Sequence, residues 1–546
     1  MASEHKPVFI RAASGLVRTM SLKDAVLWNS MAQGIGMGTV SWTVPVMAGL
    51  LPGTDYTIAS ILSIIAGVAI TLTYAHFMSA MPRSGGEYVF LSRIVHPFVG
   101  FFMNWSMVCL FVLAMGISSA TGASMLVSLF GTYVTVPPWW WTPQGQLTLS
   151  LIIVTLGMIL TLTGMRWYIR FQTIVAAICV IAIVAFVGVF AWIGNPTNFM
   201  NLFNNAFAPL YANTGTTPYD YVLQQAKAGG WQEFTGAPFS LSNTVAMMVV
   251  FGWAGLFTVA SLSSYIAGEM KNAESSKTQV GALTGGWLVG ALITIGLGYQ
   301  MMAVIGANWL GAGYVTQYNP DVFRMPVAPV GFPFPLLPYL VDKNVAAIIL
   351  LSVMLLGVTW YLMQLIMVSR SMFAWSFDRI LPTRLADVNP RLKSPLKAIV
   401  VSYLLGLLVL TGYLTGGAGF VGYYFSLMSA AGWLSYSVFV VVGLTAIVFP
   451  FAKKRLYDVM PIKSNIGPVP TLTILGLLSA IFFGAMASCY VWWSNYASVL
   501  GVWDMRTSLL IIGVYILAVI VFFGSRAYWK SKGVDMEAAF KEIPPA

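Results

Sequence analysis

The sequence predicts an all-α polytopic membrane protein. Of its 546 residues, 58% are hydrophobic and only 8% are charged, and the mean hydropathy is +0.80. A soluble domain does not have this composition. Apolar runs recur along the chain, and each is as long as a helix must be to cross the roughly 30 Å hydrocarbon core of a bilayer. Lys and Arg gather in alternate connections between these runs, as they do in the cytoplasmic loops of membrane proteins.

Taken in order, the apolar runs predict twelve transmembrane helices separated by short polar segments. The predicted spans are 25–50, 57–81, 98–130, 147–164, 171–194, 244–266, 279–305, 344–375, 397–415, 420–450, 470–494 and 506–526. With the N-terminus in the cytoplasm, 24 of the 28 Lys and Arg residues fall on the cytoplasmic side. The four on the other side are Lys227, Arg324, Lys343 and Arg506. This asymmetry predicts that both termini are cytoplasmic.

The same asymmetry explains the net charge of +11 without a nucleic-acid partner, because these cations set orientation and face anionic lipid. The segment 1–24 has four scattered cations and no apolar core, so we expect a cytoplasmic N-terminal segment and not a removable signal peptide. We expect a multi-pass protein of a prokaryotic plasma (cell) membrane, with a cytoplasmic tail at 527–546.

Several kinds of site are excluded by the residues present. Cys109, Cys179 and Cys489 all lie in predicted spans, which leaves no disulfide framework and no CxxC metal site. The three histidines are too scattered for a zinc or haem site, and no Lys follows a Gly, so the chain has no GxxxxGK phosphate loop and no ATP site. No buried nucleophile–base cluster is visible, so we do not expect an enzyme, and no cofactor is predicted.

The first span contains three glycines within five residues, in the stretch MAQGIGMGTVSWTVP. Gly34 and Gly38 lie four apart and share a helix face, the small-xxx-small pattern by which membrane helices pack closely. Gly36 lies about 200° from either, so packing on that face does not explain it. Each glycine costs a helix roughly 1 kcal/mol relative to Ala. The pattern therefore predicts that the backbone unwinds here, which membranes tolerate only beside a cavity or a polar partner.

The sixth span contains a second predicted break, at Gly252 and Gly255 in FGWAGLFTVASLSSYIAGEMKN. If 25–194 and 244–450 are two repeats of five helices, the first helix of each repeat is broken. Such paired breaks are typical of a transporter substrate site at the bilayer midplane. Half-helix N-termini favour an anionic group and half-helix C-termini a cationic one. An α-amino acid carries both groups, so the breaks predict an amino acid substrate.

Three blocks of sequence resemble the amino acid–polyamine–organocation (APC) superfamily of transporters. They are GIGMGTV (34–40), MPRSGGEYVFLSR (81–93) and SRSMFAWSFDRILPTRLADVNPRLKSP (369–395), and the likeness covers the first ten spans. The resemblance implies an amino acid permease with the LeuT-type five-plus-five inverted repeat, in which helices 1 and 6 are unwound at the midplane. The spans in 470–526 then lie outside the repeats.

The resemblance also implies roles for individual residues. The N–H groups of Gly36, Met37 and Gly38 hold the substrate carboxylate, and the carbonyls of Ile35 and Phe251 hold its ammonium. Phe251 and Trp253 form an aromatic lid and pocket wall. The other residues implied for the second break are Gly252, Ala254 and Gly255. On spacing alone, an aromatic residue beside a glycine break is more often a packing residue than a gate.

The side chain of the substrate is predicted from an absence. No Asp, Glu, Lys or Arg must lie in the middle of a span, since Arg370, Asp378 and Glu269 fall near cytoplasmic ends. A charged substrate side chain would need a buried partner of opposite charge. We therefore expect neutral, apolar amino acids; the alternative is another organic cation, a polyamine or a nucleobase carried by the same fold. A channel is a further alternative.

The ion that drives transport stays open between H⁺, Na⁺ and simple exchange. Cys179 aligns where several proton-coupled members carry a lysine, and a thiol cannot supply that charge. His76 aligns where members commonly have Glu, and histidine titrates near neutrality. Thr359 is a candidate ligand for sodium. Packing as a small buried apolar residue explains Cys179 better than a coupling role does, and an interfacial position is the more usual explanation for His76.

Three connections are unusual. The outer segment 195–243 is predicted to be a long extracellular loop. The outer segment 306–343 is apolar and rich in proline, which predicts a partly buried cap. On the cytoplasmic side, 82–97 is predicted to be either an amphipathic plug or a plain surface helix.

Overall fold

The computed structural model describes residues 15–33, 35, 37–41, 43–253, 255–257, 260–324, 331–415, 420–492 and 501–541. Gly34, Gly36 and Ala254 lie outside the described residues. In the described part, helices make up nearly all of the regular structure. The strands found there are one short antiparallel pair, β1 (Asn465–Ile466) and β2 (Val469–Pro470).

Nine helices in the described part are long and apolar enough to cross a membrane. Most coincide with single elements, and the stretch Ser276–Val304 combines α12 (Ser276–Val280), the π turn η4 (Gly281–Gly285) and α13 (Gly286–Val304). The remaining eight are α4 (Tyr56–Ala80), α6 (Pro97–Gly131), α7 (Pro143–Leu162), α8 (Met165–Ile193), α16 (Lys343–Phe377), α18 (Phe420–Ala452), α20 (Thr471–Cys489) and α22 (Met505–Ser531). Two shorter apolar helices, α11 (Leu241–Trp253) and α17 (Leu396–Thr415), follow predicted spans as well. The prediction of a polytopic all-α membrane protein is confirmed.

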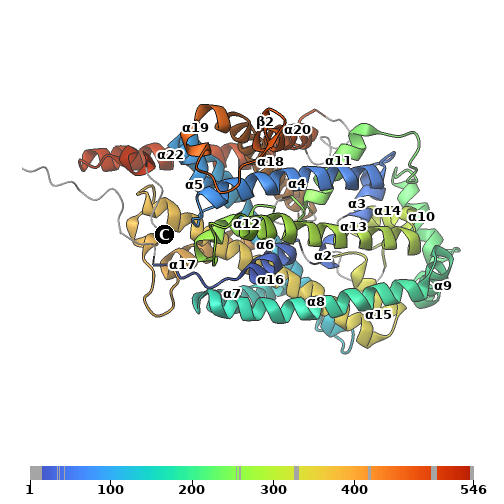
Figure 1. Cartoon of the computed structure of the whole chain (residues 1–546). Coiled ribbons are helices and arrows are strands. Elements are labelled where there is room, and N and C mark those ends of the chain that lie inside the picture. The colour runs from blue at the N-terminus through green and yellow to red at the C-terminus, as the bar shows by residue number, and fades with distance from the viewer. Residues whose placement is uncertain are drawn as a thin grey trace, which may run out of the picture.

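The long helices run along a common axis, and α4, α13 and α8 lie side by side on the face seen in Figure 1. At one end of the bundle are α5 (Glu87–Ile94), α12 and α19 (Lys454–Tyr457). At the other end are α9 (Pro196–Phe207), α10 (Pro218–Ala228), α14 (Ala307–Thr316) and α15 (Leu337–Leu340). Short 3₁₀ segments complete the connections: η1 (Pro138–Trp141), η2 (Ala208–Tyr211), η5 (Phe334–Leu336), η6 (Thr383–Ala386) and η8 (Met536–Lys541).

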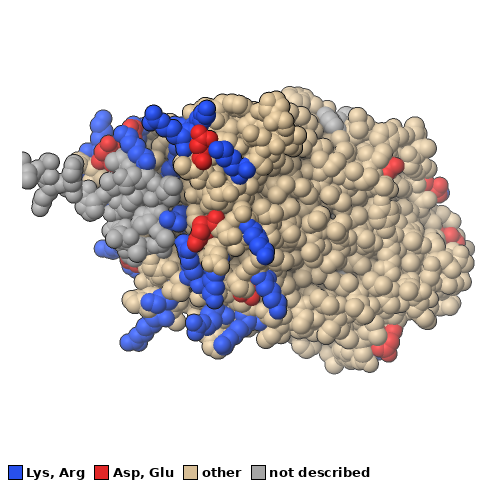
Figure 2. Space-filling view, viewed as in Figure 1, with Lys and Arg blue, Asp and Glu red and all other residues tan. Residues whose placement is uncertain are grey.

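Charged residues are distributed unevenly along this axis. On the face shown in Figure 2, Lys and Arg cluster at the end that holds α5, α12 and α19. The middle of the molecule is free of charge on that face, and the opposite end shows only acidic residues. The uncharged middle is the part that a bilayer would cover.

The structure differs from the predicted boundaries where helices extend past the apolar run. α8 begins at Met165, before the predicted start at 171, and α22 continues to Ser531. Arg166 and Arg170 lie in the first turns of α8, and the Arg170 guanidinium stacks on Trp167 at 4.6 Å. Long cationic side chains keep their charge at the interface while the helix continues. Hydropathy alone therefore predicts these helices to be shorter than they are.

The connecting segments are more ordered than predicted. The segment 195–243 contains α9, η2 and α10, and α10 packs against α14. α14 lies against α3 (Val44–Leu50) and its Trp309 is fully buried, as a partly buried cap requires. α5 is buried along nearly its whole length, so the alternative of a plain surface helix at 82–97 is wrong.

Candidate functional site

The first predicted span consists of three separate helical pieces. α1 (Leu22–Ala32) ends before the glycine patch, α2 (Met37–Val40) follows it, and α3 begins at Val44. The interruption at 33–36 was predicted from the glycines. The second interruption, at 41–43, was not predicted; Pro45 lies in the first turn of α3, where the ring favours a new helix start.

The second break follows α11. Gly255 adopts φ +94°, and its N–H donates to the Gly252 carbonyl at 3.0 Å. The Leu256 N–H donates to the Phe251 carbonyl, also at 3.0 Å, so this oxygen keeps one lone pair for a further donor. The chain then resumes as the 3₁₀ segment η3 (Leu262–Glu269). The α-helix therefore ends where the glycine pattern predicts it.

The two breaks lie against each other. A Cβ placed on Gly255 would lie 3.4 Å from the Ala32 carbonyl oxygen and 2.8 Å from the Trp360 indole of α16. A Cβ on Gly252 would lie 1.8 Å from the Tyr436 hydroxyl of α18. Glycine is thus required at both positions for close approach, and at Gly255 for backbone conformation as well. The last carbonyls of α1 and the turn after α11 meet in the interior of the bundle.

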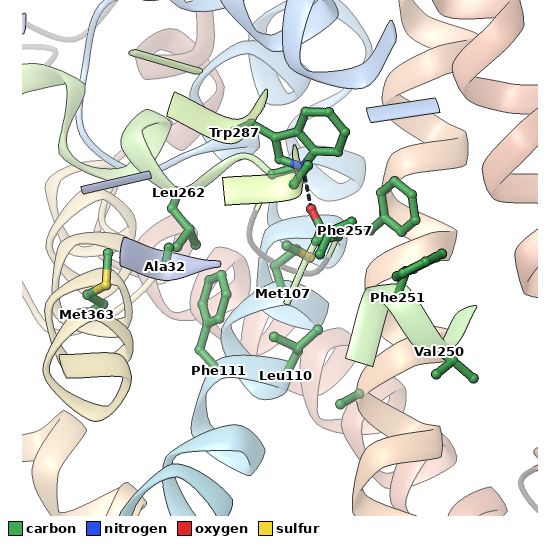
Figure 3. Packing of buried hydrophobic residues seen from close by; sticks show 14 of the residues in the cluster. Ala32, Met107, Leu110, Phe111, Val250, Phe251, Phe257, Leu262, Trp287 and Met363 are labelled. Atoms are coloured by element: carbon green, nitrogen blue, oxygen red, sulfur yellow. Dashed lines mark hydrogen bonds between the residues drawn. The ribbon is translucent and has the colours of Figure 1, made fainter. Parts of the chain in front are cut away.

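Hydrogen bonds hold the two broken segments in place. The Trp287 indole donates to the Leu256 carbonyl, just past the second break (Figure 3). The Asn29 side chain donates to the Ala282 carbonyl at 2.6 Å and accepts the Ser263 N–H at 3.3 Å. The Ser30 hydroxyl donates to the Gly286 carbonyl at 2.9 Å. α1 is therefore fixed both to the helix that contains η4 and to η3.

The surroundings of the breaks are apolar. Figure 3 shows side chains from α1, α6, α11, α13 and α16 packed around them, and every labelled residue is hydrophobic. The labelled residues are Ala32, Met107, Leu110, Phe111, Val250, Phe251, Phe257, Leu262, Trp287 and Met363. The Phe251 ring is fully buried, 5.4 Å from that of Tyr56. The polar groups near these side chains include backbone groups and a few side chains of α1 and its end, namely those of Asn29, Ser30 and Gln33.

The structure places most of the predicted site residues at these two breaks. Ile35 is buried in the first turn, where its N–H donates to the Ser30 carbonyl at 3.2 Å. Met37 and Gly38 open α2, so their N–H groups have no acceptor in a preceding helical turn. Trp253 is the last residue of α11. Gly36 and Ala254 lie outside the described residues.

The three coupling candidates lie in different surroundings. Cys179 of α8 is buried in one cluster with Met31 and Ile35, so it packs beside the first break. Thr359 of α16 is fully buried and donates to the Leu355 carbonyl at 2.8 Å; α16 packs against α2. His76 lies near the end of α4, where its Nδ1 is 2.8 Å from the Leu72 carbonyl.

Several residues at the breaks were not predicted. Trp360, Tyr436 and Trp287 come from three later helices, and nothing in their local sequence marks them. Gln33 follows α1 directly and is fully buried, and its side-chain amide finds no hydrogen-bond partner among the described residues. A buried, unpaired amide is unusual, and beside a break it is available to a ligand or a water.

Two buried ion pairs lie away from the breaks. The Arg370 guanidinium of α16 donates two hydrogen bonds to the Glu269 carboxylate of η3, from Nε at 2.7 Å and from Nη2 at 3.2 Å. Arg93 of α5 binds Asp378 at 2.7 Å. In the described part of the chain, no group of three or more His, Cys, Asp and Glu side chains is placed to hold a metal ion.

Comparison with known proteins agrees with this geometry. The family model described as amino acid permease matches residues 25–502. The chain is also 25% identical over 395 residues to the branched-chain amino acid permease BcaP of Bacillus subtilis (strain 168). That alignment covers 69% of this chain and 72% of the relative.

Proposed function

This chain belongs to the amino acid permease family, and from that premise we propose that it is a secondary active transporter of neutral, apolar amino acids. It works by alternating access across the plasma membrane, driven by an ion gradient or by exchange. The proposal includes the LeuT-type fold with twelve transmembrane helices in a five-plus-five inverted repeat, with both termini in the cytoplasm.

The meeting of the two helix breaks is the observation that carries this proposal. Residue Gly255 lies against the Ala32 carbonyl, so groups freed by both breaks face one small region of the bundle. The N–H groups of Gly36, Met37 and Gly38 bind the substrate carboxylate. The carbonyls of Ile35 and Phe251 bind its ammonium. This arrangement recognises the part that all α-amino acids share.

The apolar surroundings support an apolar substrate side chain. In this proposal Phe251 and Trp253 serve as lid and wall, and Gly252, Ala254 and Gly255 complete the substrate site. None of the side chains labelled in Figure 3 is able to pair with a second charge on the substrate. The relative from Bacillus subtilis is named for branched-chain amino acids, which are of this chemical class.

The test is uptake of labelled leucine, isoleucine and valine into liposomes that contain the purified chain. Proton and sodium gradients are imposed separately, so that substrate and driving ion are read in one experiment. We expect saturable uptake that one gradient or an internal amino acid stimulates. His76, Cys179 and Thr359 are the coupling candidates to be replaced one at a time. Ohmic current without saturable uptake would identify a channel and refute the proposal.

A ligand panel tests recognition of the two ends of the amino acid. We expect leucine to raise the melting temperature of the purified protein. At a concentration of 100 times Kd, the stabilisation is about 2.7 kcal/mol. Isoamylamine lacks only the carboxylate and 4-methylpentanoate only the ammonium, and we expect neither to stabilise. Stabilisation by isoamylamine but not by leucine would instead favour the alternative of an organic cation transporter.

A further inference from the structure

Glu87 is a buried carboxylate that the proposed transport site does not use. It is the first residue of α5, and it is 0% exposed. The Tyr265 hydroxyl donates to it at 2.8 Å, Asn104 Nδ2 at 2.8 Å and the Tyr74 hydroxyl at 3.2 Å. These donors come from η3, α6 and α4, so four separate elements meet at one carboxyl group.

No cation balances this carboxylate among the described residues. The titratable groups that face it are the Tyr74 and Tyr265 hydroxyls, from α4 and η3. The hydrogen bonds and ion pairs of the described part bring it no Lys, Arg or His from α4, α5, α6, α16 or α18. The other two deeply buried carboxylates in the described part of the chain, Glu269 and Asp378, each bind an arginine. Glu87 therefore differs from both in having only neutral partners.

Opposing effects act on the pKa of the Glu87 carboxyl, and their net result is a pKa above the ordinary value. Burial raises the pKa of the Glu87 carboxyl, while the hydrogen bonds from Asn104, Tyr265 and Tyr74 act in the opposite direction. The N-terminus of α5 also favours the ionised form, because the helix dipole is positive there. An isolated buried charge would otherwise be neutralised by taking up a proton.

Both protonation states find hydrogen-bond partners in this cluster. The ionised carboxylate accepts from all three donors. A protonated carboxyl can donate to the Tyr74 hydroxyl, or to Asn104 Oδ1, which has no partner among the described residues. Rotation of the Asn104 amide would bring that oxygen to the position that Nδ2 now occupies.

The cluster is tied to the segment that follows the second helix break. The Gly85 N–H donates to the Tyr265 carbonyl at 3.2 Å, and the Gly86 N–H donates to the Ser264 carbonyl at 3.4 Å. Tyr265 and Ser264 both belong to η3, whose position depends on the break at Gly252 and Gly255. If η3 moves, Glu87 loses the Tyr265 donor, and the pKa of its carboxyl rises further.

We propose that Glu87 is a proton-binding site whose occupancy is coupled to the position of η3 and thereby to the transport cycle. The inference rests on the proposed function, because it assigns the coupled ion and its residue for the same transporter. A proton bound at Glu87 favours the arrangement in which Tyr265 has moved away. An ionised Glu87 favours the arrangement described here. Coupling of this kind is reciprocal, so a proton gradient biases the movement.

The test compares two modes of transport by the purified full chain in liposomes. Counterflow of labelled leucine needs no gradient, whereas accumulation under an imposed pH gradient needs proton coupling. With one unit of pH difference and one proton per substrate, the wild type should accumulate leucine about tenfold. Glu87→Gln should keep counterflow and lose this accumulation. Glu233→Gln, which changes an exposed carboxylate elsewhere, is the matched control and should behave as the wild type.

Tyr265→Phe provides a second readout that does not depend on Glu87→Gln folding. Removing a donor to the ionised carboxylate raises its pKa, so the midpoint of the pH profile of uptake should shift to higher pH. A wild type without counterflow for any amino acid would refute the proposed function. A wild type with counterflow but no proton-driven accumulation would overturn this inference alone. It would also be overturned if Glu87→Gln stayed proton-driven, or if Tyr265→Phe left the midpoint unchanged.

Discussion

Gly252 matters for the space that it leaves to a neighbouring helix. Its place in an apolar run predicts a helix breaker, but in the structure Gly252 lies within α11, and the left-handed conformation belongs to Gly255. A side chain at Gly252 would overlap the Tyr436 hydroxyl, which donates to the Val249 carbonyl at 3.3 Å. Its role is therefore to let α18 approach the end of α11.

Replacing Gly252 with alanine should displace the second break. The added Cβ would lie 1.8 Å from the Tyr436 oxygen, so either α11 or the tyrosine must move. Overpacking of this kind typically costs about 1–3 kcal/mol. We expect a lower melting temperature. We also expect the rate of leucine counterflow to fall at least as much as the fraction of folded protein does. Thermal denaturation and counterflow on the same preparation measure both.

Two variants separate overlap from a general effect of replacing glycine. Gly296 is an exposed glycine of α13, and a Cβ added there would have no neighbouring atom within 4 Å. Gly296→Ala should therefore leave the stability of the protein unchanged or raise it slightly. Adding Tyr436→Phe to Gly252→Ala removes the overlapping oxygen and should restore part of the lost stability. If the double variant were no more stable than Gly252→Ala, steric overlap would not be the cause.

At the level of residues, the sequence predicted those features that depend on the identity of a single residue. Glycine clusters inside apolar runs indicated the breaks, since no other residue both weakens a helix and allows close approach. The neighbours of those glycines could not be predicted in the same way. Tyr436 and Trp360 are ordinary aromatic residues of long apolar helices. Glu87 becomes unusual only when Tyr74, Asn104 and Tyr265 meet around it.

Among the elements, η3 connects the second break to one end of the bundle. Its last residue, Glu269, binds Arg370 of α16, and both side chains are at most 2% exposed. The Glu269 carbonyl also accepts the Met20 N–H at 3.0 Å, which fixes the segment before α1 to the same point. η3 is thus held at its end by a side-chain pair and by a backbone contact.

Arg370→Met should destabilise the protein strongly, because it leaves the Glu269 carboxylate buried without a cation. Removing one partner of a buried pair typically costs about 3–5 kcal/mol. Lys397→Met is the control, because Lys397 and Asp387 form an exposed pair at 2.8 Å whose loss should cost at most about 1 kcal/mol. Thermal denaturation of the purified variants gives the comparison.

The double variant Glu269→Leu/Arg370→Met removes both charges and should recover most of the stability. Apolar replacement of a whole buried pair is often neutral. A double variant as unstable as Arg370→Met would show that the cost comes from lost packing and not from an unpaired charge.

Elements were predicted well where an apolar run is long. Helices such as α4, α6 and α16 follow the predicted spans closely, because the bilayer requires that length. Short elements were predicted less well. α5 lies in the segment 82–97, but its neighbours bury it. The segment 195–243 was predicted to be a loop, although Phe199, Phe203 and Phe207 of α9 are spaced four residues apart and form a buried face. The second interruption of the first span, at 41–43, was not predicted, because the one residue that indicates it is Pro45. Tertiary packing determines these elements.

At the scale of the whole molecule, charge predicts how the bundle sits in the membrane. Lys and Arg gather at the end that holds α5, α12 and α19 (Figure 2), while α9, α10 and α14 form the opposite end. Cationic loops remain on the cytoplasmic side during insertion. We therefore expect the end with α9, α10 and α14 to face outward.

Cysteine labelling in intact cells tests this orientation. Thr216→Cys places a thiol between η2 and α10, and Ser531→Cys places one at the last residue of α22; both positions are exposed. A membrane-impermeant maleimide should label Thr216→Cys in intact cells and Ser531→Cys only after permeabilisation. Background should be low, because Cys179 and Cys489 are buried and Cys109 is mostly so. Labelling of Ser531→Cys in intact cells would reverse the orientation. It would also place Glu87, which begins α5 at the cation-rich end, on the side from which protons enter.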